Sequence, residues 1–108
     1  MSASEKRQHP RKDVFSPVLI ALEDQGYLTE AWDLSRGGAR LGRPANWGGA
    51  DGVGFKIYFL LDQETVITLA ATLVRAGPDH LGVRFAPDQD ERVQALMYEA
   101  RFMEQGTG

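Results

Sequence analysis

The sequence predicts a mainly β domain, a small antiparallel barrel or sandwich that is followed by one C-terminal helix. Three observations predict this class. Short segments with apolar residues at every second position run from Val18 to Phe85 and are separated by turns rich in glycine and proline. After Pro87 the apolar spacing changes to three and four residues, which is the period of an α-helix. A length of 108 residues supports one modest hydrophobic core, so a single domain is expected.

The β region divides into about six strands joined by short connections, a pattern typical of small closed β folds. Gly26 is expected to supply the positive φ of the first turn. A proline- and glycine-rich loop is expected over 44–52, and "AGPD" is expected to turn the chain between the last two strands. The predicted strands are 18–22, 27–32, 38–43, 53–61, 65–75 and 80–85.

The two ends of the chain differ from this β region. Residues 1–12 are polar and are expected to form a flexible N-terminal arm, with the folded domain over 13–105. The helix is expected over 88–105, where Asp88 and Glu91 have the spacing of a capping box. Its apolar stripe needs a partner, for which the barrel is the natural candidate. The stripe consists of Val93, Leu96, Met97, Ala100 and Met103.

Composition excludes several classes of protein. The chain has no cysteine, so disulfides, thiolate metal sites and a cysteine nucleophile are ruled out. No apolar run approaches the ~20 residues that cross a bilayer, and the N-terminus does not read as a signal peptide, so a cytoplasmic protein without membrane contact is expected. The net charge of −3 disfavours a broad DNA- or RNA-binding surface, and any bound anion should be small and held locally. Neither a metal site nor a nucleophile–base pair can be named, so no enzyme is expected.

Two short motifs nevertheless carry side chains suited to an anionic nucleotide. "RQHPR" places Arg7 and Arg11 four residues apart in this acidic chain. Each guanidinium can clamp a phosphate, or the O6/N7 edge of guanine, through two parallel hydrogen bonds. "DLSRGG" places Asp33 and Ser35 on the same side of an extended segment. Asp33 can accept hydrogen bonds from a guanine N–H edge, and Ser35 can bond phosphate or base.

The remaining residues of the second motif allow several interpretations. Gly37 and Gly38 let the backbone turn sharply and let a ligand approach without a Cβ in the way. Arg36 and Arg40 adjoin the motif, where they either add positive potential or are simply solvated. Taken alone, the two motifs also have plain structural interpretations, a solvated basic arm and a Ser- or Asx-stabilised turn.

Together the two motifs resemble the PilZ domain family, whose pattern is RxxxR followed roughly twenty residues later by [D/N]xSxxG. The segment "GVRF" (82–85) resembles the late G-[VI]-x-F strand of that family, so the resemblance covers nearly the whole chain. It implies a six-stranded antiparallel PilZ-type β-barrel that acts as a bacterial receptor. The ligand implied is cyclic di-GMP, and no cofactor is implied.

The resemblance also implies roles for individual residues. Arg7 and Arg11 would hold phosphate and the guanine Hoogsteen edge. Asp33 and Ser35 would read guanine, and Gly38 would keep the approach to the ligand open.

Further contributions are implied for residues beside the two motifs. Lys6 precedes the first arginine, and a basic residue there implies two stacked, intercalated ligand molecules. Arg75 stands where the family often has a tryptophan that packs on a guanine, and a guanidinium can also stack on a base. Gly37 and Arg36 complete the predicted ligand-binding set.

The function implied is a receptor that changes the conformation of its N-terminal arm on binding and signals in trans to an effector protein. The sequence does not identify that effector. The alternative is a PilZ-like adaptor that binds no ligand and acts through protein contacts in pilus or motility assembly. A small β-barrel that binds single-stranded nucleic acid is disfavoured by the acidic composition.

Overall fold

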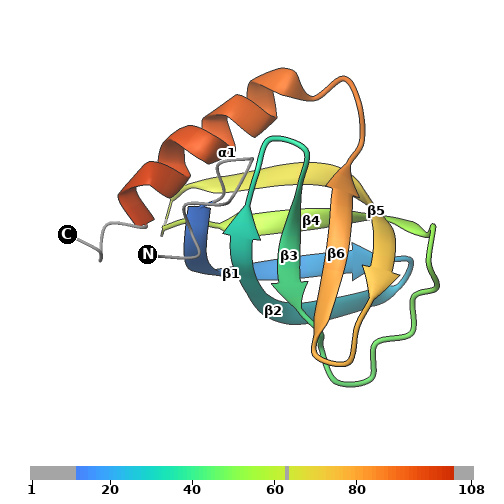
Figure 1. Ribbon diagram of the computed structural model, residues 1–108. Coiled ribbons are helices and arrows are strands. Elements are labelled where there is room, and N and C mark those ends of the chain that lie inside the picture. The colour runs from blue at the N-terminus through green and yellow to red at the C-terminus, as the bar shows by residue number, and fades with distance from the viewer. Residues whose placement is uncertain (1–11, 63, 104–108) are drawn as a thin grey trace, which may run out of the picture.

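The computed structural model describes residues 12–62 and 64–103 and shows a closed barrel with one helix against it (Figure 1). Around the barrel the strand order is β1-β2-β3-β6-β5-β4, and every neighbouring pair is antiparallel. The predicted class, a mainly β six-stranded barrel with a C-terminal helix, is therefore confirmed. The elements are β1 (Lys12–Leu22), β2 (Gln25–Leu34), β3 (Gly38–Gly42), β4 (Gly54–Leu60), β5 (Val66–Ala76), β6 (His80–Phe85) and α1 (Asp90–Met103).

β1 is longer than the predicted strand and begins within the segment expected to be the flexible arm. Lys12 pairs with Leu34 and Asp13 pairs with Asp33, before an irregularity that precedes Ser16. The described strand thus includes Lys12, the last residue of the expected arm. The first residues of β1 were not predicted as strand because they lack an alternating apolar pattern, and they are held in the sheet by pairing with β2. The rest of the predicted arm, residues 1–11, lies outside the described residues.

The turn between β1 and β2 is made by residues other than those expected, whereas the "AGPD" turn between β5 and β6 lies where it was predicted. Gly26 pairs with Ala21 within the ladder, and the turn between β1 and β2 is instead formed around Glu23, whose φ is 55°. The expectation for Gly26 is wrong because the hairpin turns two residues earlier. Between β4 and β5, the backbone N–H of Glu64 donates to Asp62 Oδ1 at 2.8 Å, and this bond lowers the pKa of Asp62 below its ordinary value.

The hydrophobic core consists of alternate strand residues that point into the barrel. Phe55, Ile57 and Phe59 on β4 are buried, as the period-two pattern predicts. Trp47, in the loop before β4, is also buried and lies with its ring centroid 5.0 Å from Tyr27 and 5.8 Å from Phe55. Each fully buried side chain of this size contributes about 1.5–3 kcal/mol, so this interior supplies the main driving force for closing the barrel.

α1 packs against β1 and β5 through part of its predicted apolar stripe. Val93 and Leu96 are buried, and Met97 packs against the core at their side. The other two members of the stripe are not among the side chains that the structure describes. Within the described part of the chain, no helix is long and apolar enough to span a lipid bilayer.

The helix begins two residues later than the start of the predicted range. The backbone N–H of Val93 donates to Gln89 O at 2.9 Å, which makes Gln89 the N-cap and Asp90 the first helical residue. The predicted capping box from Asp88 to Glu91 is therefore one residue out of register. Asp88 instead has a left-handed φ of 67°. Asp90 and Glu91 lie in the first turn, where the helix dipole favours acidic side chains.

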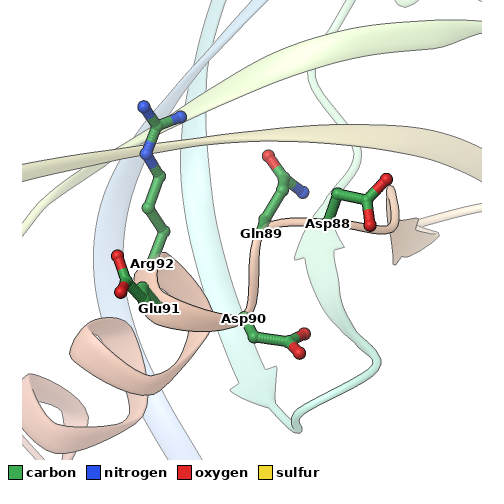
Figure 2. A pocket seen from close by; sticks show the side chains of 5 residues that line it. All are labelled: Asp88, Gln89, Asp90, Glu91 and Arg92. Carbon is green, nitrogen blue, oxygen red and sulfur yellow. The ribbon is translucent and has the colours of Figure 1, made fainter.

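The side chain of Gln89 connects the start of α1 to the edge of β5. Its Oε1 accepts from Ala70 N–H at 2.8 Å, and its Nε2 donates to Ala70 O at 3.0 Å and to Ala86 O at 2.9 Å. Figure 2 shows this amide pointing toward the strand, whereas Asp90 points away from it. Phe85, opposite Ala71, is the last residue of β6, so the Gln89 amide extends the hydrogen bonding of β5 beyond the end of its neighbour.

We predict that Gln89→Ala lowers the free energy of unfolding by about 1–3 kcal/mol, because it leaves the partly buried Ala70 N–H without this acceptor. Gln94→Ala is the matched control, since it makes the same substitution at an exposed position of α1 and should change stability by less than about 0.5 kcal/mol. Urea denaturation of both variants measures the difference. Equal effects would show that the Gln89 bonds do not stabilise the fold.

Candidate functional site

The "DLSRGG" motif forms the turn between β2 and β3. Leu34 is the last residue of β2 and Gly38 is the first residue of β3. Ser35 donates twice to Gly38 O, from its backbone N–H at 2.9 Å and from its hydroxyl at 3.3 Å. The Ser-stabilised turn that the plain interpretation predicts is therefore present. The Ser35 oxygen also has lone pairs that can accept a further hydrogen bond.

The two glycines of the turn have different surroundings. A Cβ on Gly38 would overlap the carbonyl oxygen of Val83 and lie 3.2 Å from Arg84 Cα, both on β6. Gly38 is therefore needed for the close approach of two strands, which is a different reason from the open ligand approach that the resemblance implies. A Cβ on Gly37 would meet no atom within 4 Å, so Gly37 is the open position. The Gly37 carbonyl accepts from Phe85 N–H at 2.9 Å, which fixes the turn against the end of β6.

An open groove of about 370 Å³ runs along this turn. It brings together four of the predicted site residues from "DLSRGG" and adds side chains from β5 and β6. Arg36 and Arg75, which were also predicted, are exposed and do not line it. The lining consists of Asp33, Ser35, Gly37, Gly38, Ala39, Arg40, Val74, His80, Gly82 and Val83.

The charged centre of the groove is an ion pair between Asp33 and Arg40. The Asp33 Oδ2 and Arg40 Nη2 atoms are 3.2 Å apart, and the two residues are directly opposite in the β2–β3 ladder. The Asp33 side chain is 7% exposed, whereas that of Arg40 is 45% exposed. A carboxylate this buried needs a charged or hydrogen-bonding partner. The groove therefore presents an acceptor and a donor side by side.

The β5 wall of the groove is formed by Val74. The β5–β6 register is irregular between Leu73 and Arg75, and Arg75 pairs with Gly82. Val74 lies at this irregularity, lines the groove and is 52% exposed. Of these two β5 residues, Val74 lines the groove and Arg75 does not, and the ligand contact expected of Arg75 stays a prediction.

The three basic residues expected near the N-terminus, Lys6, Arg7 and Arg11, lie outside the described residues. The first described residue, Lys12, pairs with Leu34, which sits between Asp33 and Ser35 in the chain. The described chain therefore begins directly beside the "DLSRGG" turn.

A second hollow, of about 530 Å³, lies at the start of α1 and is shown in Figure 2. Three of its five lining residues are acidic, and its charge is wrong for an anionic ligand. Among the residues that the structure describes, no group of three His, Asp or Glu side chains is arranged to hold a metal ion. The hollow is lined by Asp88, Gln89, Asp90, Glu91 and Arg92.

Arg40, Val74 and His80 line the groove but were not among the predicted site residues. Arg40 could have been predicted from the sequence. A hairpin turn over 35–38 pairs residue 34 with 39 and therefore residue 33 with 40, which puts Arg40 opposite Asp33. His80, whose Nδ1 is 3.1 Å from Asp79 Oδ1, and Val74 reach the groove only through pairing of distant strands. No local pattern in the sequence indicates them.

The PilZ domain family model matches residues 5–99, and the chain therefore belongs to the PilZ domain family. PilZ domains are receptor and adaptor domains rather than enzymes. No curated protein sequence matches the chain.

Solved PilZ structures share the fold. The PilZ domain of YcgR from Escherichia coli, solved with c-di-GMP, has a TM-score of 0.73 and 19% identity, covering 94% of each chain. The PilZ domain of CeSA from a cellulose-synthesizing bacterium has a TM-score of 0.67 and 21% identity, covering 91% of this chain and 97% of that one. The Bacillus subtilis inhibitor of motility MotI/DgrA has a TM-score of 0.70 and 18% identity over 94% of this chain, which spans 51% of that protein.

We predict that alanine has a large effect on stability at one glycine of the turn and almost none at the other. Gly38→Ala should lower the free energy of unfolding by more than about 2 kcal/mol, because the new Cβ forces β3 and β6 apart. Gly37→Ala should change it by less than about 0.5 kcal/mol, because its Cβ enters open space. Urea denaturation without ligand distinguishes the two, and equal losses would contradict the assigned close contact at Gly38.

Proposed function

We propose that the chain is a cytoplasmic receptor for cyclic di-GMP, which carries out no catalysis and passes ligand binding to an effector protein. The observation that supports this most strongly is the register of β1 on β2. Lys12 lies opposite Leu34, and Arg11 is bonded to Lys12, so their Cα atoms are about 3.8 Å apart. The described chain therefore begins opposite "DLSRGG", one residue after the second arginine of RxxxR, and this supports a ligand shared by the two motifs.

The chemistry of the two motifs fits a ligand with two guanines and two phosphates. Arg7 and Arg11 supply forked donors for phosphate oxygens and for guanine O6 and N7. Asp33 supplies an acceptor for guanine N–H groups in the groove, and Ser35 supplies a hydroxyl at its edge. Gly37 leaves space for a base beside the turn. The same fold is found in the YcgR domain that was solved with c-di-GMP.

In this proposal, the ligand draws the N-terminal arm onto the groove and changes the surface that an effector reads. Lys6 beside Arg7 favours two intercalated ligand molecules. The effector would act in motility, in exopolysaccharide synthesis with biofilm formation, or in virulence, and the first two agree with the names of the MotI and CeSA structures. Neither a nucleic acid nor a membrane is a partner.

One observation favours the second candidate function, an adaptor that binds no ligand. Asp33 and Ser35 both have partners within the chain, Arg40 and the Gly38 carbonyl. A groove whose polar groups are satisfied internally can be stable without any ligand. Cyclic di-GMP titration separates the two functions, because an adaptor gives no binding.

We predict that Arg7→Ala and Arg11→Ala each weaken cyclic di-GMP binding about ten- to hundredfold, since each removes charge-assisted hydrogen bonds worth about 1.5–3 kcal/mol. Titration calorimetry measures the affinity and the stoichiometry together. Arg92→Ala, which removes a charge from α1, is the control and should leave the affinity unchanged. Unchanged affinity in both arginine variants would refute the clamp, and no binding by the unsubstituted chain would refute the receptor.

A further prediction concerns the arm. Because the chain has no cysteine, Ser4→Cys provides a single attachment point for an environment-sensitive fluorophore. Cyclic di-GMP should change its emission as the arm closes over the groove. The same label in a Ser4→Cys, Asp33→Ala chain should respond only at higher ligand concentration. A label that stays silent while calorimetry reports binding would contradict closure of the arm.

A further inference from the structure

We propose that Arg40, paired with Asp33, makes the groove specific for guanine over adenine. This inference rests on the proposed function and adds to it a specificity-determining residue outside both motifs. Arg40 lies in the same groove as Asp33 and contacts its carboxylate through Nη2 at 3.2 Å. The contact uses one nitrogen of a guanidinium that carries five N–H donors, and nearly half of the side chain is exposed.

The sheet places the two residues of this pair next to each other. The β2–β3 ladder places Arg40 directly opposite Asp33, and the buried carboxylate restricts where the guanidinium can lie. On its other side Arg40 pairs with Gly82, which has no side chain to crowd it. Even a Cβ built on Gly82 would come no closer than 3.8 Å to Arg75 O. The pair thus presents an acceptor and a donor side by side in an open groove.

Such a unit matches one edge of guanine. The Watson–Crick edge of guanine carries the O6 acceptor beside the N1–H and N2–H donors. When the guanine N1–H and N2–H groups donate to the Asp33 carboxylate, the guanine O6 faces the Arg40 guanidinium and can accept from it. Adenine in the same pose places its N6 amino donor toward the Arg40 donors and a lone pair at N1 toward the Asp33 carboxylate. A site built to bond one pattern discriminates strongly against the other, because its polar groups are left unpaired.

The test compares the affinities of three cyclic dinucleotides for the unsubstituted chain and for Arg40→Ala. Each affinity is measured by competition binding, so that weakly bound ligands can also be measured. Arg40→Ala should weaken cyclic di-GMP about ten- to hundredfold, the discrimination expected of one good base contact. Cyclic di-IMP also carries O6 but lacks the N2 amino group, and it should lose affinity by the same factor. Cyclic di-AMP should lose much less affinity, so the ratio of the cyclic di-GMP affinity to the cyclic di-AMP affinity should be smaller in Arg40→Ala than in the unsubstituted chain.

Arg84→Ala is the matched control, because Arg84 is an exposed arginine on β6, next to β3, that does not line the groove. This substitution removes the same charge and should weaken the binding of all three ligands slightly and to the same extent. Arg40→Lys keeps the charge without the fork, so it should recover part of the affinity but not the preference. If Arg40→Ala does not fold, Arg40→Lys and Arg40→Met carry the same comparison.

The outcomes separate the inference from the proposed function. A parallel loss of all three ligands in Arg40→Ala would make Arg40 a structural or purely electrostatic residue and would overturn the inference. Tighter cyclic di-GMP binding would also overturn it, because Arg40 would then compete with the ligand for Asp33. In both cases the receptor proposal stands. A chain that binds none of the three ligands would overturn the receptor proposal and this inference together.

Discussion

The antiparallel register of the first three strands is the constraint on which the candidate site depends. It sets Lys12 opposite Leu34 on one side of β2 and Arg40 opposite Asp33 on the other. A slip of one residue would turn every side chain of β2 to the opposite face, and Asp33 would leave the groove. The buried side chains of the barrel interior prevent such a slip, because apolar residues would then be exposed to water. The hydrophobic core therefore positions a largely polar site, and Val83 belongs to both the core and the groove lining.

Several residues that define the family motif serve the fold before any ligand is present. Ser35 stabilises its own turn, and Gly38 admits the backbone of β6, which closes the barrel. The motif therefore has a structural requirement as well as a chemical one. A ligand can use what the turn leaves available, namely the open face at Gly37 and the Asp33–Arg40 pair. This division explains why stability and binding should respond differently to substitutions at neighbouring positions.

The elements with a regular apolar spacing along the chain could be predicted from the sequence, whereas features created by contacts between distant segments could not. The alternating residues of β4 and the helical stripe of α1 were predictable, because each buries one face with its own period. The start of β1 was not, since its first residues are held by pairing with β2. At the site, Asp33 was predictable from the motif and Arg40 from the hairpin register. Val74 reaches the groove through an irregular β5–β6 register that no local pattern encodes.

The claim that the arm and the groove act on one ligand is tested most directly by mapping cyclic di-GMP onto the ¹⁵N-labelled chain by NMR titration. The account predicts that the largest amide shifts appear together, from Arg7 to Lys12, over 33–40, and on β5 and β6 around Val74 and Gly82. Shifts limited to one of these regions, or centred on the acidic hollow at the start of α1, would contradict it.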